Sequence, residues 1–152
     1  MARLEQQIKT HIDQHPGLKG DQDLLLSIPG VGEKTARWLL AELPDVSQFA
    51  SAQAAAAYAG LAPREYRSGT SVKRATRLTK RGNSRLRKAL YFPAITAARH
   101  NPLVQALYDR LMAAGRPRMV AVCAAMRKLL MLCYGVLKHR QKFTLEPLKK
   151  AA

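Results

Sequence analysis

Apolar positions recur three and four residues apart over most of this chain, the spacing that places side chains on one face of an α-helix. The sparse series Leu4, Ile8 and Ile12 predicts a first helix with little core of its own, similar to the end of a longer helix or coiled coil. HPGLKG (15–20) predicts a break after it, because it contains one proline and two glycines. We therefore expect residues 1–20 to be the end of a coiled-coil or linker helix.

A pair of short helices is predicted next. DQDLLLSI (21–28) forms the first, with Asp21 as its N-cap. The turn PGVG (29–32) leads into EKTARWLLAEL (33–43), in which apolar residues share one face. Two helices joined by such a turn form a helix–hairpin–helix, here over 24–43.

The remaining helices begin and end at residues typical of helix caps. Ser51 is suited to cap SAQAAAAYAG, and Gly60 stands where a C′ glycine belongs. A helix is also predicted from Ser84 to about residue 100, with Gly82 and Asn83 as its turn and cap. Another is predicted over 101–115, with Asn101 as N-cap and Pro102 at the first helical position, and a third over 117–141, the most apolar segment. We predict an all-α, compact domain over 21–141, with its helical core at 84–141 and a frayed tail at 142–152.

A long basic segment interrupts these helices. Residues 61–83 read LAPREYRSGTSVKRATRLTKRGN, with seven Lys/Arg, one Glu and few apolar residues. The pattern predicts a loop, although SGTSV and ATRLT alternate in polarity and are compatible with a small β-hairpin.

The composition agrees with packed helices and adds a strong positive charge. The 152 residues are 47% hydrophobic but only 6% aromatic, which favours helices over a β-sandwich. The net charge is +16 and the sequence pI about 10.6, and nucleic acid is the commonest partner for such an excess. A ribosomal or chromatin-like protein would have the same totals.

The positive charge is concentrated around the basic segment. No acidic residue occurs between Glu65 and Asp109, whereas eleven Lys/Arg occur from Arg64 to Arg99. A solvated face normally carries both signs, so we favour a phosphate-binding surface over a face that is merely soluble. The candidate contacts are Arg64, Arg67, Lys73, Arg74, Lys80, Arg81 and Arg85.

The PGVG turn is a second candidate contact with nucleic acid. Gly30 and Gly32 permit backbone angles closed to other residues, so the turn amides can point outward at the start of a helix that carries Lys34 and Arg37. This arrangement would hold a phosphate without reading sequence. The alternative is a helical hairpin used only for packing.

Cysteine usage and the N-terminus indicate a reduced, cytosolic protein. Cys123 and Cys133 are ten residues apart in a helical stretch and point in different directions, so we interpret both as core residues. The N-terminus is too polar for a signal peptide. No apolar run reaches about 18 residues, so no membrane span is expected.

Ser68 and Gly69 lie in the middle of the basic segment. A serine on a tight turn among cations could act as a nucleophile, because its alkoxide and a charged phosphate would both be stabilised. Taken alone the dipeptide is weak support, since most Ser-Gly pairs are simple turns. Tyr66 is a rival nucleophile, and the segment contains no histidine to act as base.

Three segments in this order resemble one known family. SIPGVGEKTA, then FASAQAAAAYAGLAPREYRSGTS, then LTKRGNSRLRKALYFPAITAARHNP are similar to the C-terminal domain of insertion-sequence transposases of the 110/1111 type. The resemblance covers about residues 21–140. It implies a recombinase that works on DNA with a bridge RNA and whose nucleophile is the serine of the SG pair, here Ser68. It also implies an N-terminal RNase H-like domain in which four acidic residues bind divalent metal, expected to be Mg²⁺.

This chain begins where the coiled coil of the family would end, and its ten Asp/Glu include no four-carboxylate constellation. The resemblance therefore implies a transposase domain inactive by itself and without its own cofactor. The expected partners are DNA, a guide RNA and a second copy of the chain, in the bacterial cytoplasm. Two alternatives remain: a non-catalytic nucleic-acid-binding module with Ser68 as a turn residue, or a packing and dimerisation domain with its interface in 101–141.

Overall fold

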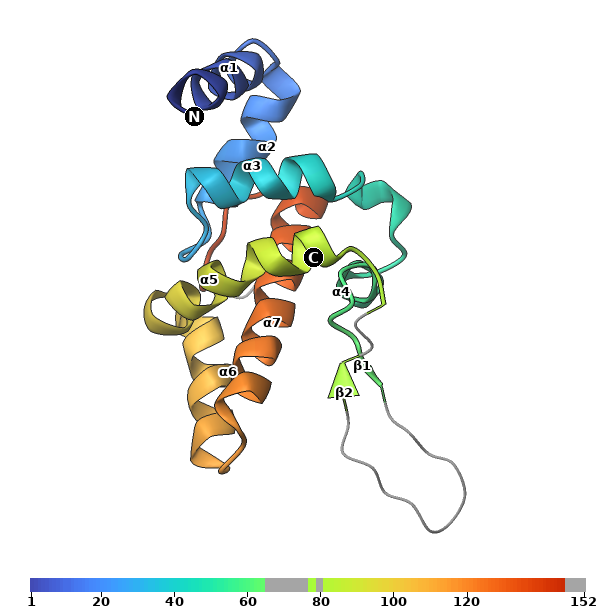
Figure 1. The fold of residues 1–152 in the computed structure, drawn as a ribbon, viewed down its shortest axis with the longest axis vertical. Helices are drawn as coiled ribbons and strands as arrows, with labels where there is room; N and C mark the ends of the chain where they lie inside the picture. Colours follow the sequence, from blue (N-terminus) through green and yellow to red (C-terminus); the bar gives the residue numbers. More distant parts are fainter. Residues whose placement is uncertain (65–76, 79–80, 147–152) are drawn as a thin grey trace.

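The computed structural model describes residues 1–64, 77–78 and 81–146. Within them it has seven α-helices, one 3₁₀ turn and one pair of two-residue strands (Figure 1). In chain order these are α1 (Ala2–Asp13), α2 (Pro16–Leu26), α3 (Glu33–Glu42), η1 (Val46–Gln48), α4 (Ala52–Tyr58), β1 (Pro63–Arg64), β2 (Arg77–Leu78), α5 (Ser84–His100), α6 (Pro102–Ala113) and α7 (Arg118–His139). The predicted all-α, compact class is confirmed, because the strands contribute only a short ladder.

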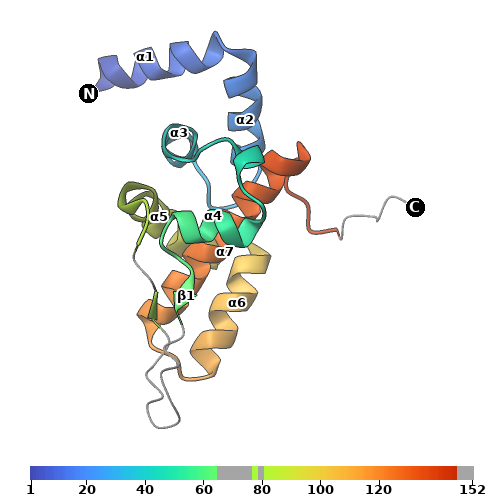
Figure 2. The same cartoon turned by 90° about the vertical axis from the view of Figure 1, so that its right-hand side faces the viewer.

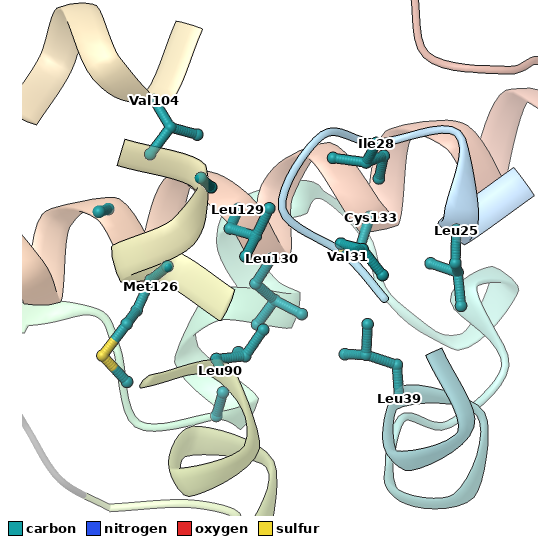
Figure 3. Packing of buried hydrophobic residues seen from close by; sticks show 14 of the residues in the cluster. Leu25, Ile28, Val31, Leu39, Leu90, Val104, Met126, Leu129, Leu130 and Cys133 are labelled. Carbon is teal, nitrogen blue, oxygen red and sulfur yellow. The ribbon is translucent and has the colours of Figure 1, made fainter. Parts of the chain in front are cut away.

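Helix α7 is the centre of the core. Helices α2, α4, α5 and α6 and the 3₁₀ turn all pack against it. Its buried side chains include Leu129, Leu130 and Cys133, which meet apolar residues from α2, the 29–32 turn, α3 and α5 (Figure 3). Burial raises the pKa of the Cys133 thiol to about 12. Cys133 is therefore a core residue, as predicted, and Cys123 is half-buried in the same helix.

The length and apolarity of α7 bear on the expectation that the chain has no membrane span. Judged by these two properties alone, α7 could cross a membrane. In this fold, however, other helices bury residues along its whole length, from Ala121 to Leu137. Core packing therefore accounts for its composition, as in many soluble proteins.

The N-terminal boundary also differs from the prediction. HPGLKG is not a break of six residues, because α2 begins at Pro16 and continues through Gly17 and Gly20. Proline is favourable at the first position of a helix, where its missing N–H costs nothing. Asp21 is consequently not a cap; it lies inside α2 and forms an ion pair with Arg140.

Helix α1 projects away from the core and packs on α2 (Figure 2). Ile12 is buried, while Leu4 and Ile8 remain exposed. The predicted sparse helix with little core of its own is confirmed. At the other end, the prediction of a frayed tail is wrong at its start. Phe143 is half-buried, and its N–H donates to Ser27 Oγ at 2.9 Å.

Helices α3 and α5 lie side by side and run in opposite directions (Figures 1 and 2). The turn that precedes α3 packs on α5 at Gly30, where an added Cβ would lie 2.6 Å from the Ala97 Cβ. Gly30 also has a φ of +106°, so glycine is required there. The turn is fixed further by Asn101, which caps α6 and donates to the Pro29 carbonyl at 3.2 Å.

The helices beyond α3 begin and end largely as predicted. Ser51 caps α4, and Asn101 and Pro102 begin α6. Gly60 and Gly115 follow α4 and α6 with positive φ, as C′ glycines do. Cap residues were therefore reliable indicators of these boundaries.

Candidate nucleic-acid interface

The basic segment 61–83 leaves the core at the C-terminal end of α4. The Leu61 N–H donates to Ala56 O at 2.9 Å, and the Gly60 N–H donates to Ala57 O at 3.0 Å. These two bonds close a Schellman motif around Gly60, whose φ is +73°. Leu61 is fully buried beneath it. The first residue of the segment is therefore fixed in the core.

The segment returns to the same place. The Asn83 N–H donates at 2.8 Å to the O atom of Tyr58, the last residue of α4, which lies within the same Schellman motif. Gly82, with a φ of +126°, lies so close that an added Cβ would be 2.2 Å from Tyr58 O and 2.9 Å from the Gly60 amide nitrogen. Both ends of the basic segment are thus anchored at one point.

A short antiparallel ladder continues from this anchor. Pro63 in β1 pairs with Leu78 in β2, and Arg64 pairs with Arg77. Of the two strands considered from the sequence, SGTSV lies outside the described residues, and ATRLT is described only at 77–78, which form β2. The ladder keeps the two arms of the segment together as they leave the helices.

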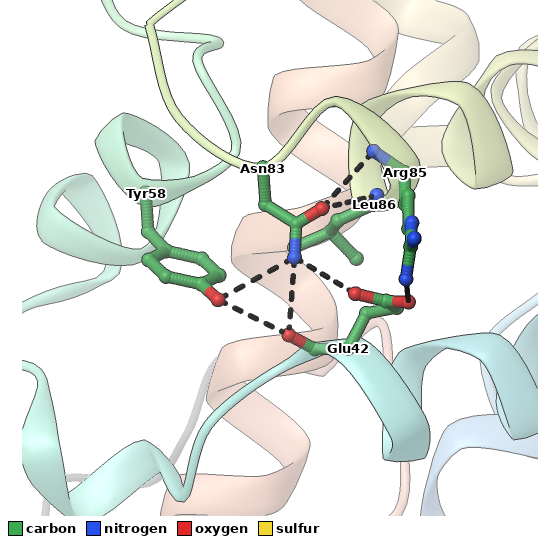
Figure 4. A network of polar contacts seen from close by, with 5 residues as sticks. All are labelled: Glu42, Tyr58, Asn83, Arg85 and Leu86. Atoms are coloured by element: carbon green, nitrogen blue, oxygen red, sulfur yellow. Dashed lines mark hydrogen bonds and ion pairs between the residues drawn. The ribbon is translucent and has the colours of Figure 1, made fainter.

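Polar contacts tie the anchor to α3 and α5 (Figure 4). The Asn83 side chain accepts from the N–H groups of Arg85 and Leu86, which caps α5. Its amide donates to Glu42 Oε2 at 3.0 Å, and the Tyr58 hydroxyl donates to Glu42 O at 3.4 Å. Arg85 also lies 3.8 Å from the Glu42 carboxylate. Sequence reasoning found Asn83 as a cap but missed Glu42 and Tyr58, which carry no local signal of this role.

Of the phosphate contacts predicted in and beside the basic segment, Arg64, Arg81 and Arg85 belong to the described residues. Arg81 and Arg85 are exposed beside the anchor, and Lys88 is exposed one turn further along α5. Arg87, half-buried, instead donates to Ala59 O and strengthens the anchor. The backbone of Arg64 lies in β1. Six other residues of interest lie outside the described part of the chain: Tyr66, Arg67, Ser68, Lys73, Arg74 and Lys80.

The PGVG turn differs in part from the predicted phosphate clamp. Gly32 has an extended backbone, with φ −95° and ψ 176°, and an added Cβ would meet nothing within 4 Å. Its glycine is therefore not required by the backbone, contrary to the prediction. Gly30 is required, but its contact with Ala97 already provides a packing reason. At the start of α3, Lys34 is exposed and Arg37 pairs with Glu33 at 3.5 Å. A contact of this turn with nucleic acid stays a prediction.

Metal ligands do not gather in the described residues. Within 1–64, 77–78 and 81–146, no group of three or more His, Cys, Asp or Glu side chains is placed to hold a metal ion.

Fold and site together define a small all-α domain that presents a cation-rich segment fixed at both ends. A family model described as "Transposase IS116/IS110/IS902 family" matches residues 22–109, more than half of the chain. The chain belongs to this transposase family. The matched region runs from α2 into α6 and includes the whole basic segment.

Curated relatives match over 65–94% of this chain. The pilin gene-inverting protein of Moraxella bovis is 36% identical over 144 residues, which are 94% of this chain and 45% of the relative. An insertion element IS110 protein of Streptomyces coelicolor, described as uncharacterized, is 33% identical over 89% of this chain and 32% of its own length. A probable family 20 transposase of Pseudomonas aeruginosa is 34% identical over 65% of this chain and 28% of its own length. This chain therefore spans less than half of each of these relatives.

Proposed function

We propose that this chain is the DNA-binding, serine-bearing domain of a transposase or recombinase. The observation that carries the proposal is the anchoring of residues 61–83, together with membership of the transposase family. A surface loop with many cations gains little from burial. An anchor at both ends, which holds the two arms of the segment together, is expected if the segment must present its side chains to DNA at a fixed position on the domain.

In this proposal Ser68 is the nucleophile. Its Oγ attacks the scissile phosphorus, a new Oγ–P bond forms, and the bond from phosphorus to one deoxyribose oxygen breaks. That oxygen leaves as a hydroxyl after taking up a proton. The serine proton passes to a base elsewhere in the assembled enzyme, because residues 61–83 contain no histidine. A divalent metal held by a separate acidic domain would supply charge stabilisation at the phosphate.

The cations of the segment would neutralise the DNA backbone on either side of Ser68. Arg64, Arg67, Lys73 and Arg74 are nearest to it in sequence, while Lys80, Arg81 and Arg85 approach the anchor. Such contacts position a duplex without reading its bases. The target sequence is then selected by another partner, which the family resemblance implies is a guide RNA. The working enzyme contains at least two copies of this chain. We place this enzyme in the bacterial cytoplasm.

Covalent trapping tests the role of Ser68. The chain is joined to the acidic domain of a family member, and a nicked duplex that cannot be religated is used to capture a protein–DNA adduct in the presence of Mg²⁺. We expect the adduct to disappear in Ser68→Ala and to persist in the matched variants Ser71→Ala and Tyr66→Phe. Mass spectrometry of the adduct identifies the modified residue. An undiminished adduct in Ser68→Ala would mean that another residue, such as Tyr66, is the nucleophile. Recombination by a full-length protein that is unchanged in Ser68→Ala would favour a non-catalytic binding module.

A further inference from the structure

Two large aromatic side chains are exposed on neighbouring helices. Trp38 on α3 is 44% exposed and Phe92 on α5 is 75% exposed. The core-facing residues of the same helices, Ala36 and Leu39 on α3 and Leu90 on α5, are fully buried. Single exposed apolar residues are common. Two exposed rings on adjacent helices require an explanation if they share one face.

The antiparallel packing of α3 and α5 puts both rings on one side of the molecule. At one end of the helix pair, Arg85 lies 3.8 Å from the Glu42 carboxylate. Trp38 precedes Glu42 by four residues and therefore lies one turn away on the same side of α3. Phe92 follows Arg85 by seven residues, two turns along the same side of α5. Both rings thus lie on the side of the α3–α5 pair on which Glu42 and Arg85 meet.

The surroundings of these rings are cationic. Lys34 lies four residues before Trp38, and Lys88 lies between Arg85 and Phe92; all three cations are exposed, Arg85 with 78% of its side chain. Helix α5 contains no Asp or Glu. Glu42 is occupied by Asn83 and Arg85, and Glu33 pairs with Arg37. We refer to Lys34, Trp38, Arg85, Lys88 and Phe92 as the α3–α5 face.

We propose that the α3–α5 face binds single-stranded nucleic acid, with bases stacked on Trp38 and Phe92 and phosphates beside the three cations. Aromatic rings set among cations are typical of proteins that bind single strands, because every unpaired base offers a flat surface to an exposed ring. A duplex hides those surfaces, so a site for duplex phosphates needs no aromatic residue. A protein interface would also favour the two rings and the arginine, but lysine is depleted at protein interfaces, and two of the three cations here are lysines. The five residues of this face do not include Ser68, and the inference, which rests on the proposed function, extends that function to unpaired strands.

Trp38 makes this proposal directly measurable, because it is the single tryptophan of the chain. The chain is titrated at moderate salt with oligo(dT) and with an abasic oligomer of equal length and charge. Stacking predicts that oligo(dT) quenches the fluorescence of Trp38, whereas the abasic oligomer binds without comparable quenching. Fluorescence anisotropy of labelled oligomers gives the two affinities.

Substitution of Phe92 tests the second ring. Phe92→Leu keeps an apolar side chain at an exposed position but removes the stacking surface. We expect it to weaken oligo(dT) binding roughly tenfold and to leave the abasic affinity unchanged. Met119→Ala, at an exposed apolar position near the start of α7, is the matched control and should change neither affinity.

Several outcomes would overturn the proposal. Equal quenching by both oligomers would mean that only phosphates are bound. An unchanged oligo(dT) affinity in Phe92→Leu, or a change in oligomeric state by light scattering without a change in affinity, would mean that the rings serve another purpose.

Duplex binding with steep salt dependence but no quenching by oligo(dT) would overturn this proposal alone. Failure to bind duplex, oligo(dT) and abasic oligomer would overturn the proposed DNA-binding function as well.

Discussion

Individual glycines fix the geometry at the base of the basic segment. Gly82 combines a positive φ with a contact too close for any side chain, and Gly30 does the same beneath α5. The sequence indicated a turn at each position. It could not distinguish Gly30 from Gly32, because only the packed structure shows that Ala97 occupies the space next to Gly30.

Gly82→Ala tests the anchor at this scale. The new methyl would collide with Tyr58 O, and alanine disfavours a φ of +126°. We expect the free energy of unfolding to fall by about 2 kcal/mol, measured by urea denaturation. The matched variant Gly135→Ala lies inside α7, where an added Cβ meets nothing within 4 Å. It should instead gain roughly 0.5–1 kcal/mol, and equal effects of the two substitutions would contradict the assigned geometry.

Helices in this fold are joined through their caps. Asn83 caps α5 and reaches Glu42 on α3, while Asn101 caps α6 and reaches the turn before α3. The sequence predicted both caps from local pattern. It could not predict the second partner of either, because Asn101 and Pro29 are 72 residues apart. At Pro16 the sequence pattern was misinterpreted: the proline was taken as part of a break between helices, whereas α2 begins there.

Asn101→Ala tests the link between α6 and the turn. The side chain is fully buried, and its loss removes both the cap and the donor to the Pro29 carbonyl. We expect a loss of about 2–3 kcal/mol in the free energy of unfolding, the sum of a lost cap and an unpaired buried carbonyl. Asn101→Ser keeps an oxygen that can cap α6 but cannot donate to Pro29 O as the amide does. Its loss should be smaller, so a serine variant as unstable as the alanine variant would argue against the capping role.

At the scale of the whole molecule, a helical core built on α7 carries a positively charged segment at one end. Charge pattern and motif order were readable from the sequence, because both are properties of consecutive residues. The return of the segment to its own starting point was not readable, because it depends on contacts between Gly82, Asn83 and the end of α4. The positions of Ser68 and of the cations around it lie outside the described residues, so their roles rest on the proposal above.

The anchors allow the binding of DNA by the basic segment to be measured directly. Because the segment is fixed by its ends, its middle cations can be replaced without disturbing the core. The variant carries alanine at Arg67, Lys73, Arg74, Arg77 and Lys80, and its helical circular dichroism should match that of the parent chain. Binding of each protein to a labelled duplex is measured by fluorescence anisotropy over a range of salt concentrations.

If residues 61–83 bind DNA, the log affinity of the parent chain should fall with log salt at a slope of about −5 or steeper, which corresponds to several neutralised phosphates. The variant should lose several units of that slope, at most roughly 0.9 for each cation removed. A parent chain that does not bind duplex at moderate salt would contradict the account. So would a variant with an unchanged slope, because residues 61–83 would then not be the surface that meets DNA.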